Sequence, residues 1–136
     1  MKLFRAWIAL LLVTGCRSMS SIRDNETDGT TEVYKGEVAT LRKKVIGMLR
    51  GMDATQLDTD EDDRVYCYLT SSVLVKGTYI GVWFKSAGEG EVAIRCLTKM
   101  YSPLHTTTQM TEEGFHRELK IALGLPVPER PRTGKY

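Results

Sequence analysis

The sequence predicts an α+β fold, a small antiparallel sheet of about four strands with two helices packed on one face, in the order β-α-β-β-β-α. Two segments carry apolar residues at helical spacing, and three show the alternation of apolar and polar residues that is typical of half-buried strands. A glycine-containing turn joins the last two strands. These segments lie within residues 32–125 of the 136-residue chain. A segment of this length builds one hydrophobic core, so we expect a single domain.

The first half of the domain contains a strand and a helix. Residues 33–37 form a short candidate strand. Helical spacing follows, with basic residues between the apolar positions Val38, Leu41, Val45, Met48 or Leu49, and Met52. Gly51 favours a helix end at this point. The acidic run 58–63 predicts a loop.

Three strands come next. The alternating segments are 65–70, 79–84 and 92–97. Gly88-Glu89-Gly90 lies between the second and the third of them, and it predicts a hairpin turn.

A second helix completes the domain. Thr111 is its expected N-cap, and Glu112 and Glu113 are favourable in its first turn. Gly124 ends this helix. Three prolines then predict an extended tail over 126–136.

The N-terminus carries a targeting signal. Residues 1–15 combine a basic start, a short apolar run and small residues, as secretory signal peptides do. The run is too short to span a bilayer, which takes about 20 apolar residues. Val13-Thr14-Gly15-Cys16 resembles the lipobox of bacterial lipoproteins. The alternative is an ordinary signal peptide in which Cys16 has no role.

The lipobox resemblance implies a lipid anchor. Cys16 becomes the new N-terminus and carries acyl chains such as palmitate, each buried methylene contributing about 0.8 kcal/mol. Because Arg17 is not the aspartate that retains lipoproteins in the inner membrane, we expect attachment to the outer membrane, facing the periplasm of a Gram-negative cell. Residues 16–31 are mostly polar and predict a flexible tether that holds the domain roughly 20 Å from its anchor.

Charge excludes one class of partner. Removal of Lys2 and Arg5 with the signal peptide reduces the 19 basic residues to 17, which equals the 17 acidic residues. A chain without net charge gives no reason to expect nucleic acid as a partner, or long-range attraction to acidic lipids.

Two cysteines remain in the mature chain. In an oxidising periplasm Cys67 and Cys96 favour a disulfide, and two buried thiols are the alternative. Strands lie about 4.8 Å apart, so a plain meander puts these two Cα atoms roughly 9.6 Å apart. A disulfide needs less than about 7 Å. A bridge and a flat three-strand meander therefore exclude each other.

Catalytic, cofactor and metal motifs are weak, and we expect no enzyme, no cofactor and no metal. Asp58, Asp60 and Asp62 alternate as in a calcium-binding EF-hand loop, but Asp63 occupies the glycine position and Leu69 the glutamate position. The two histidines, His105 and His116, are too isolated for a zinc site, and His116 is expected on a helix surface.

One predicted surface favours binding. The sheet face opposite the helices carries aromatic and basic residues of the types enriched at binding hot spots, namely Tyr66, Tyr68, Tyr79, Trp83 and Arg95. One interpretation is a docking surface for an envelope protein or a cell-wall glycan such as peptidoglycan. The other is a second small core, covered by a helix, by the segment Pro103–Met110 or by the tail.

Two functions follow from these observations. The first is a non-enzymatic envelope lipoprotein that binds or scaffolds a partner through the aromatic face. The second is a periplasmic inhibitor or immunity protein directed against a cell-wall hydrolase. For the second, Tyr79-Ile80-Gly81-Val82-Trp83-Phe84-Lys85 is similar to the Tyr-to-Trp-Lys segment of membrane-bound lysozyme inhibitors, which are also small lipoproteins.

Overall fold

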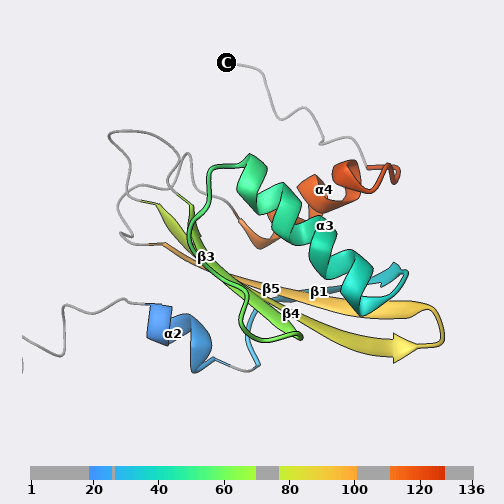
Figure 1. Cartoon of the computed structure of the whole chain (residues 1–136), viewed down its shortest axis with the longest axis horizontal. Coiled ribbons are helices and arrows are strands. Elements are labelled where there is room, and N and C mark those ends of the chain that lie inside the picture. Colours follow the sequence, from blue (N-terminus) through green and yellow to red (C-terminus); the bar gives the residue numbers. More distant parts are fainter. Residues whose placement is uncertain (1–18, 26, 70–76, 101–110, 128–136) are drawn as a thin grey trace, which may run out of the picture.

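The computed structural model describes residues 19–25, 27–69, 77–100 and 111–127, and its architecture is the predicted α+β fold (Figure 1). Five strands form one antiparallel sheet in the spatial order β1-β5-β4-β3-β2. In chain order the elements are α2 (Met19–Arg23), β1 (Thr30–Lys35), α3 (Val38–Gly51), β2 (Thr55–Asp58), β3 (Arg64–Leu69), β4 (Thr78–Gly88), β5 (Glu91–Met100) and α4 (Glu112–Ala122). Over these described ranges, the helices are all too short or too polar to cross a membrane.

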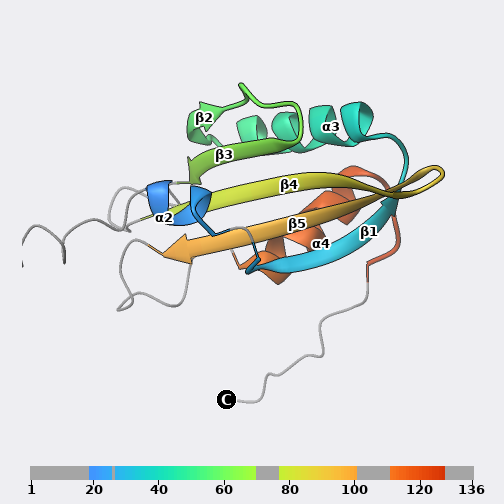
Figure 2. The same ribbon diagram turned by 90° about the horizontal axis from the view of Figure 1, so that it is seen from below.

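The two longer helices lie on the same face of the sheet, as predicted, and the short helix α2 lies on the other (Figures 1 and 2). The main core fills the space between the sheet and the two longer helices. Leu41, Val45 and Leu49 of α3 and Phe115 and Leu119 of α4 are buried in it against the inward side chains of the strands. This layer is the hydrophobic centre that the periodicity predicted.

Both long helices begin and end where the sequence signals lie. The helix α3 covers Val38–Gly51. At the start of α4 the Thr111 Oγ1 accepts a hydrogen bond from the Gly114 N–H at 2.9 Å. Gly124 follows α4 with φ +70°, a left-handed conformation that glycine adopts without steric cost. The predicted helix signals are therefore confirmed.

The strands β3, β4 and β5 form a plain meander, which corrects the prediction of a disulfide. Cys67 lies opposite Ile80 and Cys96 lies opposite Val82, so β4 separates the two cysteines. Both are buried free thiols. Burial raises the pKa of Cys67 to about 12, and burial together with the charge of Glu112 raises that of Cys96 well above its ordinary value. The alternative of two buried thiols is the one the structure contains.

A fifth strand lies in a segment for which no strand was predicted, and only its last residue, Asp58, belongs to the predicted acidic loop. The strand β2 pairs with β3 at the sheet edge, with Thr55 opposite Tyr68 and Asp58 opposite Tyr66. It has no apolar and polar alternation, and Gln56 has φ +52°, so its pairing is irregular. The remaining acidic run after Asp58 is a loop, as predicted. The prediction of about four strands was one strand short, because an edge strand can form through backbone pairing alone.

The segment before β1 also differs from the predicted tether. Met19–Arg23 form the helix α2, and the Ile22 side chain has no exposed surface. A flexible tether over 16–31 is therefore wrong for these residues. Cys16 and the residues 128–136 of the predicted tail lie outside the described part of the chain.

Candidate binding surface

The five residues predicted for the aromatic face do lie together on the face opposite α3 and α4. Tyr68 pairs with Tyr79 across β3 and β4, and their ring centroids are 4.8 Å apart. Trp83 pairs with Arg95 across β4 and β5, and the guanidinium carbon lies 3.8 Å from the ring centroid. Tyr66 meets the edge of Trp83 at 5.7 Å. Strand register alone thus brings these aromatic and cationic side chains together on one face.

The centre of this face is a socket for Ile22. Tyr66, Gly81 and Leu97 are direct neighbours across β3, β4 and β5, and we call these three residues the Ile22 socket. A Cβ atom at Gly81 would lie 2.5 Å from the Cγ2 of Ile22 and 2.5 Å from the Trp83 ring. Only glycine leaves room for both side chains at this position. Burial of Ile22 contributes roughly 1.5–3 kcal/mol to the docking of α2.

Polar contacts orient the residues that follow Ile22. The Arg23 guanidinium forms an ion pair with Asp58 at 2.5 Å and lies 4.9 Å from the Tyr66 ring centroid. Arg95 Nη1 donates hydrogen bonds to the backbone carbonyls of Asn25 and Asp28. Exposed ion pairs contribute at most about 1 kcal/mol each, so these contacts orient the segment more than they hold it.

The aromatic face is buried at its centre and half-buried around it. Tyr66 is 5% exposed, and with Ile22 and Leu97 it forms a second small core under α2. Tyr68, Tyr79 and Trp83 are only half-buried, and we call these three residues the aromatic rim. Pro103–Met110, which was one of the expected covers, lies outside the described residues.

Sequence reasoning predicted Tyr66 on this face but missed Ile22, Gly81 and Leu97. Ile22 is a single apolar residue in a polar stretch, so it has no periodic pattern to identify it. Gly81 carried the better signal, because a glycine in the middle of a strand marks a place where another group approaches the backbone closely. The alternation placed Leu97 in a strand, but no contact was predicted for its side chain.

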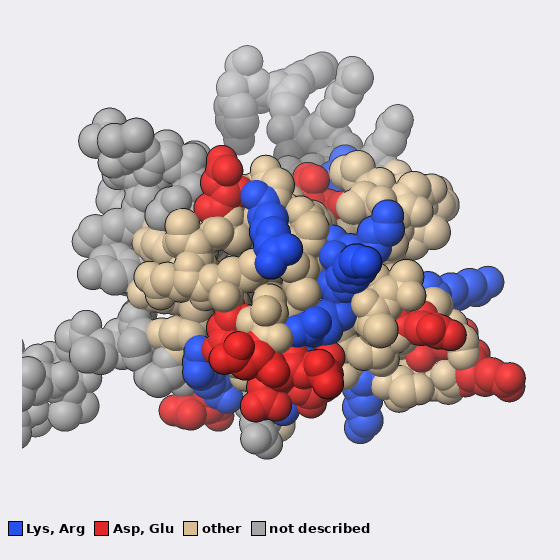
Figure 3. Space-filling view, in the orientation of Figure 1, with Lys and Arg blue, Asp and Glu red and all other residues tan. Residues whose placement is uncertain are grey.

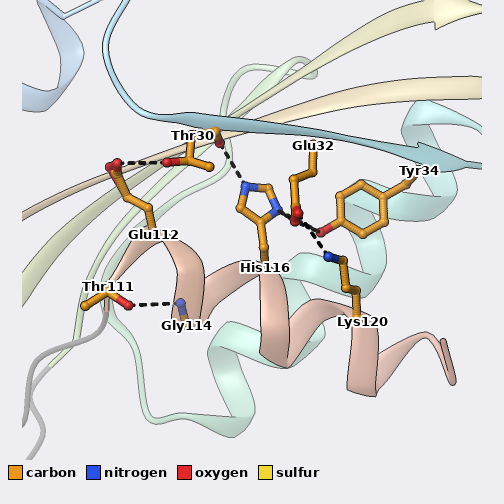
Figure 4. A network of polar contacts seen from close by, with 8 residues as sticks. All are labelled: Thr30, Glu32, Tyr34, Thr111, Glu112, Gly114, His116 and Lys120. Carbon is orange, nitrogen blue, oxygen red and sulfur yellow. Dashed lines mark hydrogen bonds and ion pairs between the residues drawn. The ribbon is translucent and has the colours of Figure 1, made fainter. Parts of the chain in front are cut away.

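A buried polar network lies on the other face, between α4 and the edge strand β1 (Figure 4). His116 is 2% exposed, so the expectation that it lies on the helix surface is wrong. Its Nε2 lies 2.8 Å from the Thr30 carbonyl oxygen, which can only accept, and therefore Nε2 carries a proton. Its Nδ1 lies 2.7 Å from the Tyr34 Oη and 3.1 Å from Glu32 Oε2. Both ring nitrogens are thus engaged, and the imidazole links α4 to β1.

The pKa values of two neighbours of His116, Glu32 and Tyr34, are shifted by burial, hydrogen bonds and nearby charges. Partial burial alone would raise the pKa of Glu32, but a hydrogen bond from Lys120 at 2.9 Å and the charges of His116 and Lys120 outweigh it and lower this pKa. Burial, and then the nearby Glu32 carboxylate, raises the pKa of Tyr34. The network therefore stabilises an ionised Glu32 and a neutral Tyr34.

The Asp58 carboxylate and two backbone carbonyls of the acidic run are engaged with protein groups. One oxygen of the Asp58 carboxylate pairs with Arg23, and the other accepts the Asp60 N–H at 3.1 Å. Arg42 of α3 donates to the carbonyls of Thr59 and Glu61. Within the residues that the structure describes, no three His, Cys, Asp or Glu side chains are arranged to hold a metal ion.

Comparisons of the chain with protein-family models, with curated proteins and with solved structures find no match.

Proposed function

We propose that the protein is a non-enzymatic lipoprotein of the cell envelope that is anchored through acyl chains on Cys16 and binds a partner through its aromatic rim. The lipobox supports the anchor and an outer-membrane location facing the periplasm. The expected partner is an envelope protein or a cell-wall glycan. This proposal describes a binding or scaffolding role rather than a catalytic one.

The observation that carries the proposal is the preorganised aromatic rim. Tyr68 is fixed by a hydrogen bond that its Oη accepts from the Gly77 N–H at 2.9 Å, and Tyr79 packs against its ring. Trp83 is held beneath Arg95. Half-exposed rings that are already held in place lose little side-chain entropy when a partner binds them. Tyr, Trp and Arg are also the residue types most enriched at energetically important contacts.

The test is site-specific photo-crosslinking in living cells. A photoreactive residue at position 79 places the probe on the rim and leaves Tyr66, Gly81 and Leu97 of the Ile22 socket in place. The matched control places the same probe at position 121 on α4, where Ile121 is 52% exposed on the opposite side of the sheet. The proposal expects one dominant adduct from position 79 that position 121 does not give. Identical adducts from both positions would refute a specific rim.

The inhibitor function remains the second candidate, because Tyr79 and Trp83 of the segment that is similar to lysozyme inhibitors both lie on the rim. Inhibition of muramidase activity by the purified mature protein, lost on substitution of Tyr79 by Ala, would favour this candidate over a scaffolding role. Unchanged muramidase activity at saturating protein would exclude it.

A further inference from the structure

The helix α2 begins only three residues after the cysteine that carries the proposed anchor. Cys16 and Met19 are separated by three peptide units, and a chain of three residues spans at most about 11 Å between their Cα atoms. Met19 packs against the small core formed by Ile22, Tyr66 and Leu97. While α2 is docked, the anchor point is therefore confined to a short distance from the sheet face that carries the socket.

Release of α2 would change this distance. The next fixed element is β1, which begins at Thr30, fourteen residues after Cys16. A flexible chain of that length has a root-mean-square span of roughly 20 Å and leaves the orientation of the domain open. The docked helix thus replaces a long flexible tether by a short link attached to one face.

The arrangement of layers shows which face of the sheet carries this short link. The helix α2 lies on one side of the sheet, and α3 and α4 lie on the other (Figure 2). We propose that docking of α2 in the Ile22 socket holds the domain against the membrane of its own anchor, with the aromatic face turned toward the lipid headgroups. This inference rests on the lipid anchor of the proposed function.

This orientation limits which kinds of partner can reach the aromatic rim. A surface held at the headgroup layer meets proteins of that membrane and is turned away from cell-wall glycan farther off. Tyr and Trp are suited to this location, because their rings combine an apolar body with a polar end. The rim partner is accordingly a membrane protein that reaches the same headgroup layer.

The charge of the domain does not favour this orientation. Its cause is therefore the short link between Cys16 and the docked helix α2. The mature chain has no net charge, and acidic side chains gather over the loop between β2 and β3, close to α2 (Figures 1 and 3). Asp58, at the start of this group, pairs with Arg23 of α2. Anionic headgroups repel such a group. Without its acyl chains, the domain is therefore not expected to bind phospholipid vesicles.

The experiment uses Trp83, which is the only tryptophan of the mature chain, since the other, Trp7, lies in the signal peptide. The lipidated protein is reconstituted into phospholipid vesicles that contain a dansyl-headgroup lipid, and the efficiency of energy transfer from tryptophan is measured. In the matched control, Trp83→Phe is combined with Ile121→Trp, which moves the donor to α4. The inference expects strong transfer from Trp83 and weak transfer from position 121.

A second variant tests the role of the socket. Ile22→Asp places a charge in the buried socket and releases α2, so transfer from Trp83 should fall toward the level of the position 121 control while the protein still floats with the vesicles. Equal transfer from both positions in wild-type background, with the protein floating, would overturn the inference and leave the anchor intact. A wild-type protein that does not float would refute the anchor itself and the inference with it.

Discussion

Ile22 lies directly over Gly81. The two residues can meet because glycine has no side chain: a Cβ atom at position 81 would lie 2.5 Å from the Ile22 Cγ2. This contact joins the segment that follows the proposed anchor to the centre of the sheet. It also divides the aromatic face into a covered core around Tyr66 and a half-exposed rim. The aromatic face therefore combines a buried contact for α2 with a half-exposed surface.

Substitution Gly81→Ala tests this contact. The added methyl group collides with Ile22 and the Trp83 ring, so we expect α2 to detach or shift at a cost of about 1–3 kcal/mol. Limited proteolysis within 19–29 and a change in Trp83 fluorescence would report the release. Combining Gly81→Ala with Ile22→Ala should relieve the collision with Ile22 and leave only the contact with the Trp83 ring. Full protection of 19–29 in Gly81→Ala would contradict the predicted socket.

From the lowered pKa of Glu32 we expect the stability of the protein to depend on pH. Its pKa is lowered in the folded state, so its ionised form stabilises the fold above the ordinary carboxyl pKa of 4.5, and this contribution is lost as the pH falls through the lowered value. We expect the thermal midpoint of the wild type to drop more than that of Glu32→Gln between about pH 6 and about pH 3. The comparison is a melting series of both proteins. Parallel pH profiles would show that the Lys120 and His116 contacts contribute nothing to the preference for the ionised form.

The cysteines predict a simple thiol titration. In a Cys16→Ser variant, Cys67 and Cys96 should both react with an aromatic disulfide reagent once the protein is denatured, without any reductant. In the native state both should be protected, because burial keeps the thiolate forms rare. Absence of free thiols under denaturing conditions would restore the disulfide and require a different strand order.

The N-cap of α4 predicts a local loss of stability. Thr111→Ala removes the acceptor of the Gly114 N–H and should cost about 1 kcal/mol, whereas Thr111→Ser keeps the hydroxyl and should cost little. Denaturant unfolding of the three proteins gives the free energies. Equal losses for Ala and Ser would mean that the methyl group, not the hydrogen bond, is what Thr111 supplies.

The sequence was informative wherever a regular pattern had to fit a core. Val45 of α3 and Ile80 of β4 belong to such patterns, and both lie buried where periodicity and alternation placed them. Pattern failed for β2, since an irregular edge strand near Gln56 forms by backbone pairing and carries no alternation.

The candidate site shows the same division. Alternation was sufficient to place Tyr68, Tyr79, Trp83 and Arg95 on one face, because strand register follows from the meander. It could not identify Ile22 as the cover, since tertiary contact from a polar segment depends on a single side chain. The cysteine prediction failed for a related reason: an even number of cysteines says nothing about the distance between Cys67 and Cys96.

The most direct test of the account is incorporation of labelled palmitate into the wild-type protein and into Cys16→Ala, followed by membrane fractionation. The account predicts that the wild type is labelled and recovered with the membrane, and that Cys16→Ala is unlabelled. Continued labelling of Cys16→Ala, or an unlabelled wild type, would contradict the lipid anchor on which the function and the orientation of the domain depend.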